Sequence, residues 1–343
     1  MASVILELQN AQNSELTLFL VEEPEAHLHP QLQAVLLDYL SEQANQSLHA
    51  DHDRPAGRIQ VIATTHSPNL ASSVGIENVV VLRTAATTVA SGEGEKTAER
   101  NTVAVSLVDA AVSDDERRKI NQYLDVTRAE LLFTRRAILV EGIAEAVLLP
   151  ALARRVLSDP KERQAFRAIS IISVGSVDFA PYIKLLVVPI GGVQLLDRLV
   201  VITDGDPDVT SGEPPIAGED EDDEPAITNR RARLEGLLDA ETRGALVVAE
   251  STFTLEADLL VPVDPNSGAL RVAFLKQKPR SESRWQEFLD TAEPDRAFHE
   301  ALRKTKNYLG KGEFAHDLAV ALDKGVPFEC PPYLADAIRK SLN

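Results

Sequence analysis

Four carboxylates stand directly after two apolar stretches of the chain, and their spacing suits metal chemistry. Glu141 follows the run Ala137-Ile-Leu-Val, and Glu145 comes one helical turn later. Asp204 and Asp206, separated by a glycine, follow the run Leu199-Val-Val-Ile-Thr. Carboxylate oxygens are the ligands that Mg²⁺ and Mn²⁺ prefer in proteins. The sequence therefore predicts a divalent-metal site that these four side chains share.

Buried strands must position these carboxylates. The two apolar runs are short and continuous rather than alternating, which is typical of parallel strands that are covered on both faces. Open α/β folds build their sites at the carboxyl ends of such strands. A third run of the same kind, 245–250, ends on Glu250, and the segments 169–174 and 179–187 read as a further strand and a helix. We therefore expect an α/β fold with a mainly parallel, Rossmann-like sheet and helical additions.

Composition limits the class and compartment of the protein. The chain has 343 residues, enough for two domains, and a formal charge of −18, which argues against coating nucleic acid through bulk attraction. Much of this charge lies in the six carboxylates of 219–224, inside a predicted loop at 208–226. The single cysteine, Cys330, excludes an intrachain disulfide and a multi-cysteine zinc site, and favours the cytoplasm. No apolar run predicts a membrane span or a secretory signal, so we expect no membrane partner.

Two early segments resemble parts of an ABC-type ATPase. Residues 16–30 resemble a Walker B strand and its loop, and residues 58–68 resemble the switch-histidine segment. The resemblance implies that Glu22 would hold Mg²⁺ of a bound nucleotide, Glu23 would orient water and His66 would sense the γ-phosphate. The chain has no G-x-x-x-x-G-K-[ST] phosphate loop, so we expect ATP to bind only if a Walker A segment exists upstream. Residues 1–85 then read as the distal half of an ATPase domain in a C-terminal fragment.

The strand, Glu-Gly-x-x-Glu, helix and strand-Asp-x-Asp order resembles a Toprim domain, and two later motifs narrow the family. Thr254-Leu-Glu256, ahead of a helix, is similar to the third acidic motif of the overcoming-lysogenization-defect (OLD) nucleases. Gly310-Lys-Gly-Glu-Phe-Ala315 is similar to the family's late lysine motif. The resemblance adds Glu256 to the metal site and implies that Lys311 stabilises the scissile phosphate, with Lys304 and Lys306 as competitors for that role.

This family resemblance implies a metal-dependent DNA endonuclease or nickase that acts in anti-phage defence or DNA repair. Two cations would activate water and stabilise the leaving oxygen. We expect Glu141, Asp204 and Asp206 to hold one ion, and Glu145 and Glu256, together with Glu250, to hold or orient the other. The resemblance also implies a homodimer and a helicase partner.

The remaining expectations concern organisation and alternatives. We expect a linker and helix over 86–135, with an exposed loop at 86–100 and a helix that starts at Ser113-Asp-Asp-Glu116 and continues to Leu131. The Toprim domain would cover 136–343. One alternative is a catalytically idle subunit that binds DNA or serves assembly through an ATPase-like scaffold. Another is an ATPase accessory similar to the structural-maintenance-of-chromosomes proteins, which predicts nucleotide binding.

Overall fold

The computed structural model describes residues 16–26, 28–49, 58–90, 96–124, 126–205, 230–305 and 308–343. The chain divides into two compact units, Met1–Asp109 with Ser113–Phe133, and Ala110–Val112 with Thr134–Asn343. The predicted ligand Asp206, the predicted acidic loop and Lys306 lie outside the described residues.

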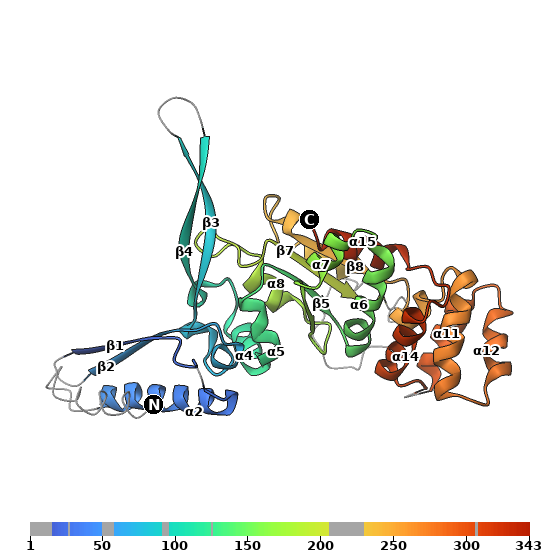
Figure 1. Cartoon of the computed structure of the whole chain (residues 1–343), viewed down its shortest axis with the longest axis horizontal. Helices are drawn as coiled ribbons and strands as arrows, with labels where there is room; N and C mark the ends of the chain where they lie inside the picture. Colours follow the sequence, from blue (N-terminus) through green and yellow to red (C-terminus); the bar gives the residue numbers. More distant parts are fainter. Residues whose placement is uncertain are drawn as a thin grey trace, which may run out of the picture. The chain divides into compact units, whose positions relative to one another are not determined.

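The first unit begins with a parallel strand pair and a helix, shown in Figure 1. These elements are β1 (Leu16–Glu22), α2 (Pro30–His49) and β2 (Arg58–Thr64), followed by the short α3 (Pro68–Ala71). The strands pair in register from Leu16 opposite Arg58 to Glu22 opposite Thr64. Helix α2 packs on the pair and buries Leu36 and Leu40 against Ile59. The parallel pairing brings the carboxyl ends of β1 and β2 together.

The predicted exposed loop at 86–100 is wrong, because most of these residues belong to strands. Strands β3 (Val80–Ala90) and β4 (Lys96–Ser106) pair antiparallel along their whole lengths, as the long hairpin in Figure 1 shows. The Thr and Val residues on both arms have high β propensity, whereas the prediction gave more weight to the Gly and Glu residues between them.

Helix α4 (Asp114–Tyr123) starts where the sequence predicted, at a capping box. The Ser113 hydroxyl accepts a hydrogen bond from the Glu116 amide at 3.2 Å, and the Glu116 carboxylate accepts one from the Ser113 amide at 2.8 Å. The predicted continuation to Leu131 is wrong: α4 ends at Tyr123, and a separate short helix, α5 (Val126–Ala129), follows.

The capping box gives a testable prediction for the first unit. We expect Ser113→Ala to destabilise α4 by about 1 kcal/mol, because the Glu116 amide loses its acceptor. Native-state hydrogen exchange over residues 114–123 should become faster in this variant, whereas Ser113→Thr, which keeps the hydroxyl, should exchange like the wild type. Equal exchange in the alanine variant would contradict the role assigned to this cap.

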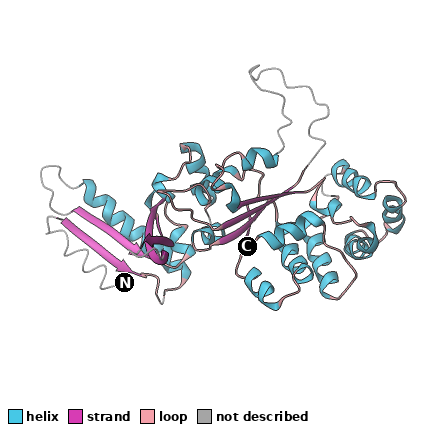
Figure 2. Ribbon diagram, turned by 90° about the horizontal axis from the view of Figure 1, so that it is seen from above, coloured by secondary structure: helices cyan, strands magenta, loops and turns pink. Residues whose placement is uncertain are grey.

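The second unit is built on a four-stranded parallel sheet of order β6-β5-β7-β8, which Figure 2 shows between helices. The strands are β5 (Arg136–Val140), β6 (Ser170–Ser173), β7 (Arg198–Thr203) and β8 (Leu246–Glu250). Successive residues of β5 and β7 are buried, so both faces of the sheet are covered. The predicted α/β fold with a parallel sheet is confirmed, and each predicted strand is present within a residue or two.

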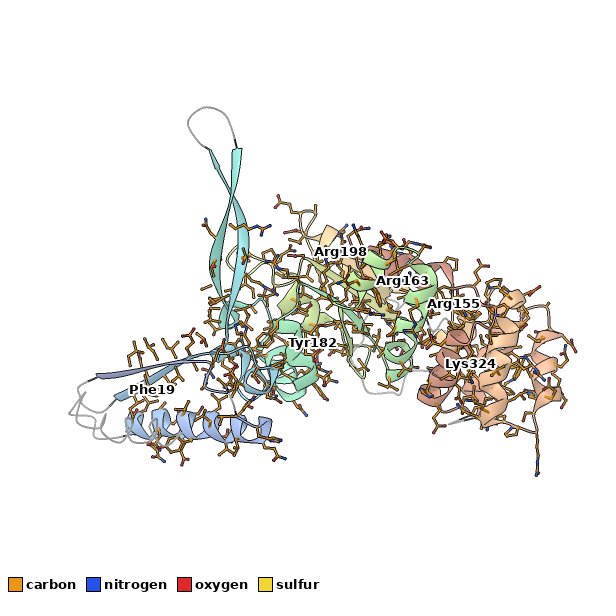
Figure 3. The ribbon with its side chains drawn as sticks, viewed as in Figure 1. Phe19, Arg155, Arg163, Tyr182, Arg198 and Lys324 are labelled. Carbon is orange, nitrogen blue, oxygen red and sulfur yellow. The ribbon has the colours of Figure 1, made fainter. Side chains whose placement is uncertain are left out.

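Helices of the second unit complete its core. They are α6 (Ile143–Val156), α7 (Pro160–Phe166), α8 (Ala180–Leu186), α9 (Arg230–Glu235), α10 (Leu255–Asp258), α11 (Val263–Gln277), α12 (Glu282–Leu289), α13 (Pro294–Lys304), α14 (Lys311–Asp323) and α15 (Pro332–Lys340). The side chain of Arg155, labelled in Figure 3, links α6 to the end of α14 by donating to the Val326 carbonyl at 3.1 Å. Within the described ranges, no helix is long and apolar enough to cross a membrane.

Candidate functional site

Two neighbouring strands bring Glu141 and Asp204 together at the carboxyl edge of the sheet. Strands β5 and β7 pair with Val140 opposite Ile202, so Glu141 and Asp204 follow at nearly the same level. The Glu141 Oε1 atom accepts a hydrogen bond from the Asp204 amide at 2.9 Å and another from the Thr203 hydroxyl. The first two acidic motifs of the sequence therefore meet in space.

Arg230 joins these residues from α9. One of its terminal guanidinium nitrogens donates to Glu141 Oε1 at 3.0 Å, Thr203 Oγ1 at 2.7 Å and the Asp204 carbonyl at 2.6 Å. The side chains of Arg230 and Glu141 are 22% and 18% exposed. No local signal distinguishes Arg230 from the arginines that follow it.

Glu145, Asp204 and Glu256 form a buried acidic cluster, with exposed fractions of 8%, 8% and 1%. Asp204 accepts a hydrogen bond from the Leu255 amide at 2.9 Å, and Glu145 accepts one from the Gly142 amide at 3.2 Å. Burial raises the pKa of Asp204 to about 8, with the neighbouring carboxylates adding to the shift and Lys311 opposing it. Burial and the charge of Glu256 also raise the pKa of Glu145. The cluster holds more negative charge than its surroundings neutralise.

Lys311 is the cation that faces this cluster. Its Nζ atom lies 3.2 Å from Glu256 Oε2, at the first residue of α14. Burial lowers the pKa of Lys311, but the charges of Glu256 and Asp204 outweigh that effect and raise it. Neither carboxylate oxygen of Glu256 accepts a well-formed hydrogen bond from the part of the chain that the structure describes. Lys304, the competitor in the sequence, instead pairs with Glu300 at 3.3 Å on an exposed helix face.

The loops after β7 and β8 touch through their backbones. A Cβ atom at Gly205 would stand 2.2 Å from the Ser251 carbonyl oxygen, so no larger residue fits there without a shift of backbone. The carboxylate of Asp258 accepts from the Thr252 amide at 2.6 Å and the Phe253 amide at 3.0 Å, which fixes the second loop. Sequence reasoning missed Asp258, although its position two residues after Glu256, at the end of the short helix α10, was a usable signal.

Glu250 has different neighbours from the acidic cluster. Burial raises the pKa of Glu250, and the charged groups that oppose this shift are Arg230 and Arg231. Its predicted place with the second ion stays a prediction.

The donor set fits a divalent cation. It consists of carboxylate oxygens, and buried anions that lie close together are stabilised by cations or by protonation. Within the described residues, no three His, Cys, Asp or Glu side chains already stand close enough to hold an ion together. Asp206, the remaining predicted ligand of the first ion, lies outside the described residues.

The raised pKa of Asp204 predicts how pH affects the metal-free protein. The pKa moves from 3.8 to about 8 on folding, so the folded state binds an extra proton between these values. Stability is then greatest at the acidic end and declines as pH rises toward 8. We expect the melting temperature in EDTA to fall over this range, and to fall less in Asp204→Asn. An equal slope in both proteins would contradict the assignment.

The predicted nucleotide-site residues lie at the ends of β1 and β2. Glu23, with a positive φ of 44°, places its amide 2.9 Å from the Thr64 carbonyl, and its carboxylate lies 3.7 Å from His66 Nε2. Glu22 is the last residue of β1. Glu25, which sequence reasoning did not single out, accepts hydrogen bonds from the Thr65 hydroxyl at 2.6 Å and the His66 amide at 3.0 Å. Glu23 and His66 are thus adjacent.

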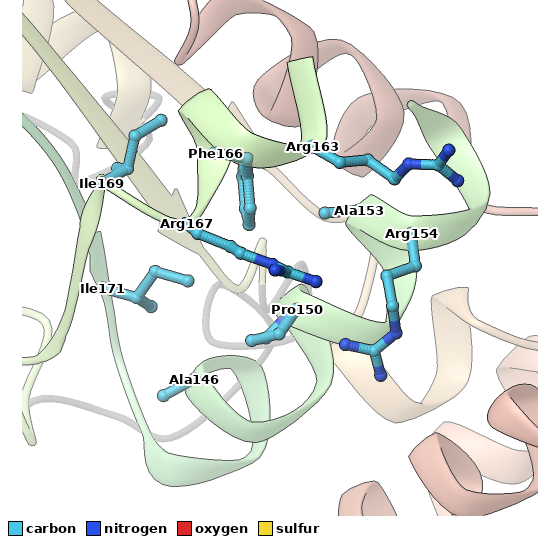
Figure 4. Close-up of a pocket in the computed structure, with 9 residues that line it drawn as sticks. All are labelled: Ala146, Pro150, Ala153, Arg154, Arg163, Phe166, Arg167, Ile169 and Ile171. Carbon is cyan, nitrogen blue, oxygen red and sulfur yellow. The ribbon is translucent and has the colours of Figure 1, made fainter. Parts of the chain in front are cut away.

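A separate hollow of about 320 Å³ lies beside the edge strand β6, as Figure 4 shows. Its lining is aliphatic or aromatic apart from arginines: Ala146, Pro150, Ala153, Arg154, Arg163, Phe166, Arg167, Ile169 and Ile171. Arg154 is already bound by Asp323 at 2.7 Å. With no carboxylate in its lining, the hollow lacks ligands for a hard cation.

Comparisons with known proteins identify two families, each matched by a different segment of the chain. Residues 1–71 match the AAA ATPase domain family, and residues 132–206 match the "overcoming lysogenization defect protein-like, TOPRIM domain" family. The OLD nuclease of Thermus scotoductus is 30% identical over 146 residues, which are 41% of this chain and only 23% of that protein. The match therefore spans less than a quarter of that relative.

Two solved structures are also similar. The C-terminal region of the Burkholderia pseudomallei OLD protein is 26% identical and covers 61% of this chain and 98% of that chain, with a TM-score of 0.41. The corresponding region of the Xanthomonas campestris pv. campestris protein is 25% identical and covers 61% and 95%, with a TM-score of 0.40. The family matches confirm the resemblance found in the sequence: residues 132–206 match an OLD-like Toprim domain, and residues 1–71 match an AAA ATPase domain.

Proposed function

We propose that this chain is a divalent-metal-dependent nuclease that hydrolyses phosphodiester bonds of DNA. The reaction takes place at the carboxyl edge of the sheet, where Glu141, Asp204 and Glu256 lie. The observation that carries the proposal is the gathering of Glu145, Asp204 and Glu256 in one buried cluster, which the Lys311 ammonium group faces at 3.2 Å from Glu256 Oε2. Several buried carboxylates side by side are costly unless cations or protons compensate them, and one ammonium group does not balance them all. The match to a nuclease family's Toprim domain supports the same conclusion.

The assignment of ligands follows from the neighbours of each carboxylate. Glu141 and Asp204, together with Asp206, are proposed to hold one Mg²⁺ or Mn²⁺ ion, and Glu145 and Glu256 to hold a second. Bound ions of this kind activate a water molecule and stabilise the leaving oxygen. Several carboxylates that raise one another's pKa exceed what one Mg²⁺ ion needs, since it usually keeps several waters, and this favours two ions.

The chain's own residues orient and balance this site. The Leu255 amide fixes one oxygen of Asp204, and the Gly142 amide fixes one oxygen of Glu145. Lys311, whose ammonium group faces Glu256, is placed to neutralise negative charge that develops on a phosphate. Its raised pKa keeps it protonated near neutral pH, so it acts as a charge and not as a base.

Several parts of the proposal rest on the family resemblance alone. These parts are DNA as the substrate, endonucleolytic cleavage or nicking as the activity, and anti-phage defence or DNA repair as the biological role. They also include a homodimer as the assembly and a helicase as the partner. The adjacent Glu23 and His66 support an ATPase-type site in the first unit, which needs a phosphate-binding segment from elsewhere to hold ATP.

Incubation with supercoiled plasmid DNA tests the proposed activity. We expect nicked or linear products in Mg²⁺ or Mn²⁺, none in EDTA, and none from Asp204→Asn in either metal. DNA binding without cleavage under all metal conditions would favour the idle binding subunit and count against the proposal.

A further inference from the structure

The contacts of Arg230 are unusual for a guanidinium group. A terminal guanidinium nitrogen carries two hydrogens, yet here one such nitrogen lies 2.6–3.0 Å from three oxygen atoms. An arginine that binds a carboxylate usually does so through two nitrogens, each with its own acceptor. In this site, by contrast, the oxygens of Glu141, Thr203 and Asp204 converge on one atom.

The three oxygens are the kinds that surround a hard cation. They belong to a carboxylate, a hydroxyl and a main-chain carbonyl, and oxygen donors of these classes coordinate Mg²⁺, Mn²⁺ and Ca²⁺. The point where they meet is therefore a position that favours positive charge. In this structure the positive charge at that point is the guanidinium group of Arg230.

We propose that Arg230 is an internal substitute for a divalent ion at Glu141, and that it must withdraw before the ion binds there. The inference rests on the proposed function, because it takes Glu141 as a metal ligand. A guanidinium group and a divalent ion cannot occupy the same position, and two positive charges side by side repel each other. Arg230 thus lowers the affinity of the site for metal, and it keeps Glu141 paired when no metal is bound.

The surroundings of Arg230 allow it to move. Its side chain and that of Glu141 are partly exposed, at 22% and 18%, so water can solvate both when they separate. Glu250 offers a second carboxylate: burial raises its pKa, and the charge of Arg230 acts against that rise.

Binding of Mn²⁺ to the full chain, measured by calorimetry and by loss of the free-ion electron paramagnetic resonance signal, tests the inference without any DNA. We expect Arg230→Gln to bind Mn²⁺ about tenfold more tightly than the wild type, because a competing charge is removed. Arg230→Lys keeps that charge and should bind within about threefold of the wild type. Arg231→Gln is the matched control, because Arg231 pairs with Glu235 at 2.7 Å on the same helix. It removes the same charge without touching Glu141.

The outcomes separate this inference from the proposed function. Unchanged or weaker Mn²⁺ binding by Arg230→Gln, in a protein that melts like the wild type in EDTA, overturns the role of Arg230 even if the wild type cleaves DNA. Equal tightening in Arg231→Gln also overturns it, since the effect would then be long-range charge. If the expected pattern of Mn²⁺ affinities appears but plasmid DNA stays intact, the proposed nuclease activity fails and the role of Arg230 stands.

Discussion

Replacing Glu256 by glutamine should lower metal-dependent DNA cleavage by about 10³-fold or more, because the proposed second ion loses a ligand worth several kcal/mol to the transition state. The same change should raise the melting temperature of the metal-free protein. Glu256 is 1% exposed beside Glu145 and Asp204, and a neutral amide of the same shape removes the repulsion among them. Lys311 loses its partner, but its side chain is 53% exposed and can be solvated.

The combination of lost activity and gained stability identifies a functional carboxylate better than either result alone. Plasmid cleavage and thermal melting in EDTA would both be measured, with Glu300→Gln as the control. Glu300 is also paired with a lysine, but on an exposed surface. A Glu256→Gln protein that melts at a lower temperature in EDTA would mean that the carboxylate supports the fold, and retained cleavage would remove Glu256 from the site.

Lys311→Ala should have the second largest effect, a decrease in cleavage of about 10²–10³-fold. Its ammonium group lies 3.2 Å from Glu256 and is proposed to balance negative charge on the reacting phosphate. Because lysine is not a metal ligand here, Mn²⁺ affinity should be retained or increased. The rate at saturating Mn²⁺ therefore separates this role from an effect on metal binding.

Lys304→Ala is the matched control for the lysine. The two lysines belong to the same motif region, but Lys304 pairs with Glu300 on a helix surface. We expect this variant to cleave DNA at the wild-type rate. If Lys304→Ala is inactive and Lys311→Ala is active, the assignment of the phosphate-facing lysine is wrong.

Much of the sheet and its acidic edge could be predicted because the signals are local. The strands before Glu141 and Asp204 are continuous apolar runs, and burial on both faces of a parallel sheet produces that pattern directly. The carboxyl end of each strand is then fixed by chain direction. Parallel neighbours place those ends at one edge, which is why separate motifs could be combined into one site.

Other features depend on contacts between distant segments and have no local signal. Arg230 lies 89 positions from Glu141, and nothing in its own helix separates it from Arg231. The pairing of β3 with β4 was hidden by the Gly and Glu residues between them in the sequence, although pairing along eleven residues in each strand decides the structure. In both cases tertiary pairing outweighs local composition.

The close approach of Gly205 to Ser251 couples the loop after β7 to the loop after β8. The backbone of Ser251 occupies the space that a side chain at position 205 would need. A shift of the loop at Gly205 toward Ser251 would therefore have to move the loop at Ser251 as well. Substitutions at position 205 and at positions 251–252 therefore depend on one another. A larger residue at 205 is tolerated only if the backbone at 251–252 changes its position.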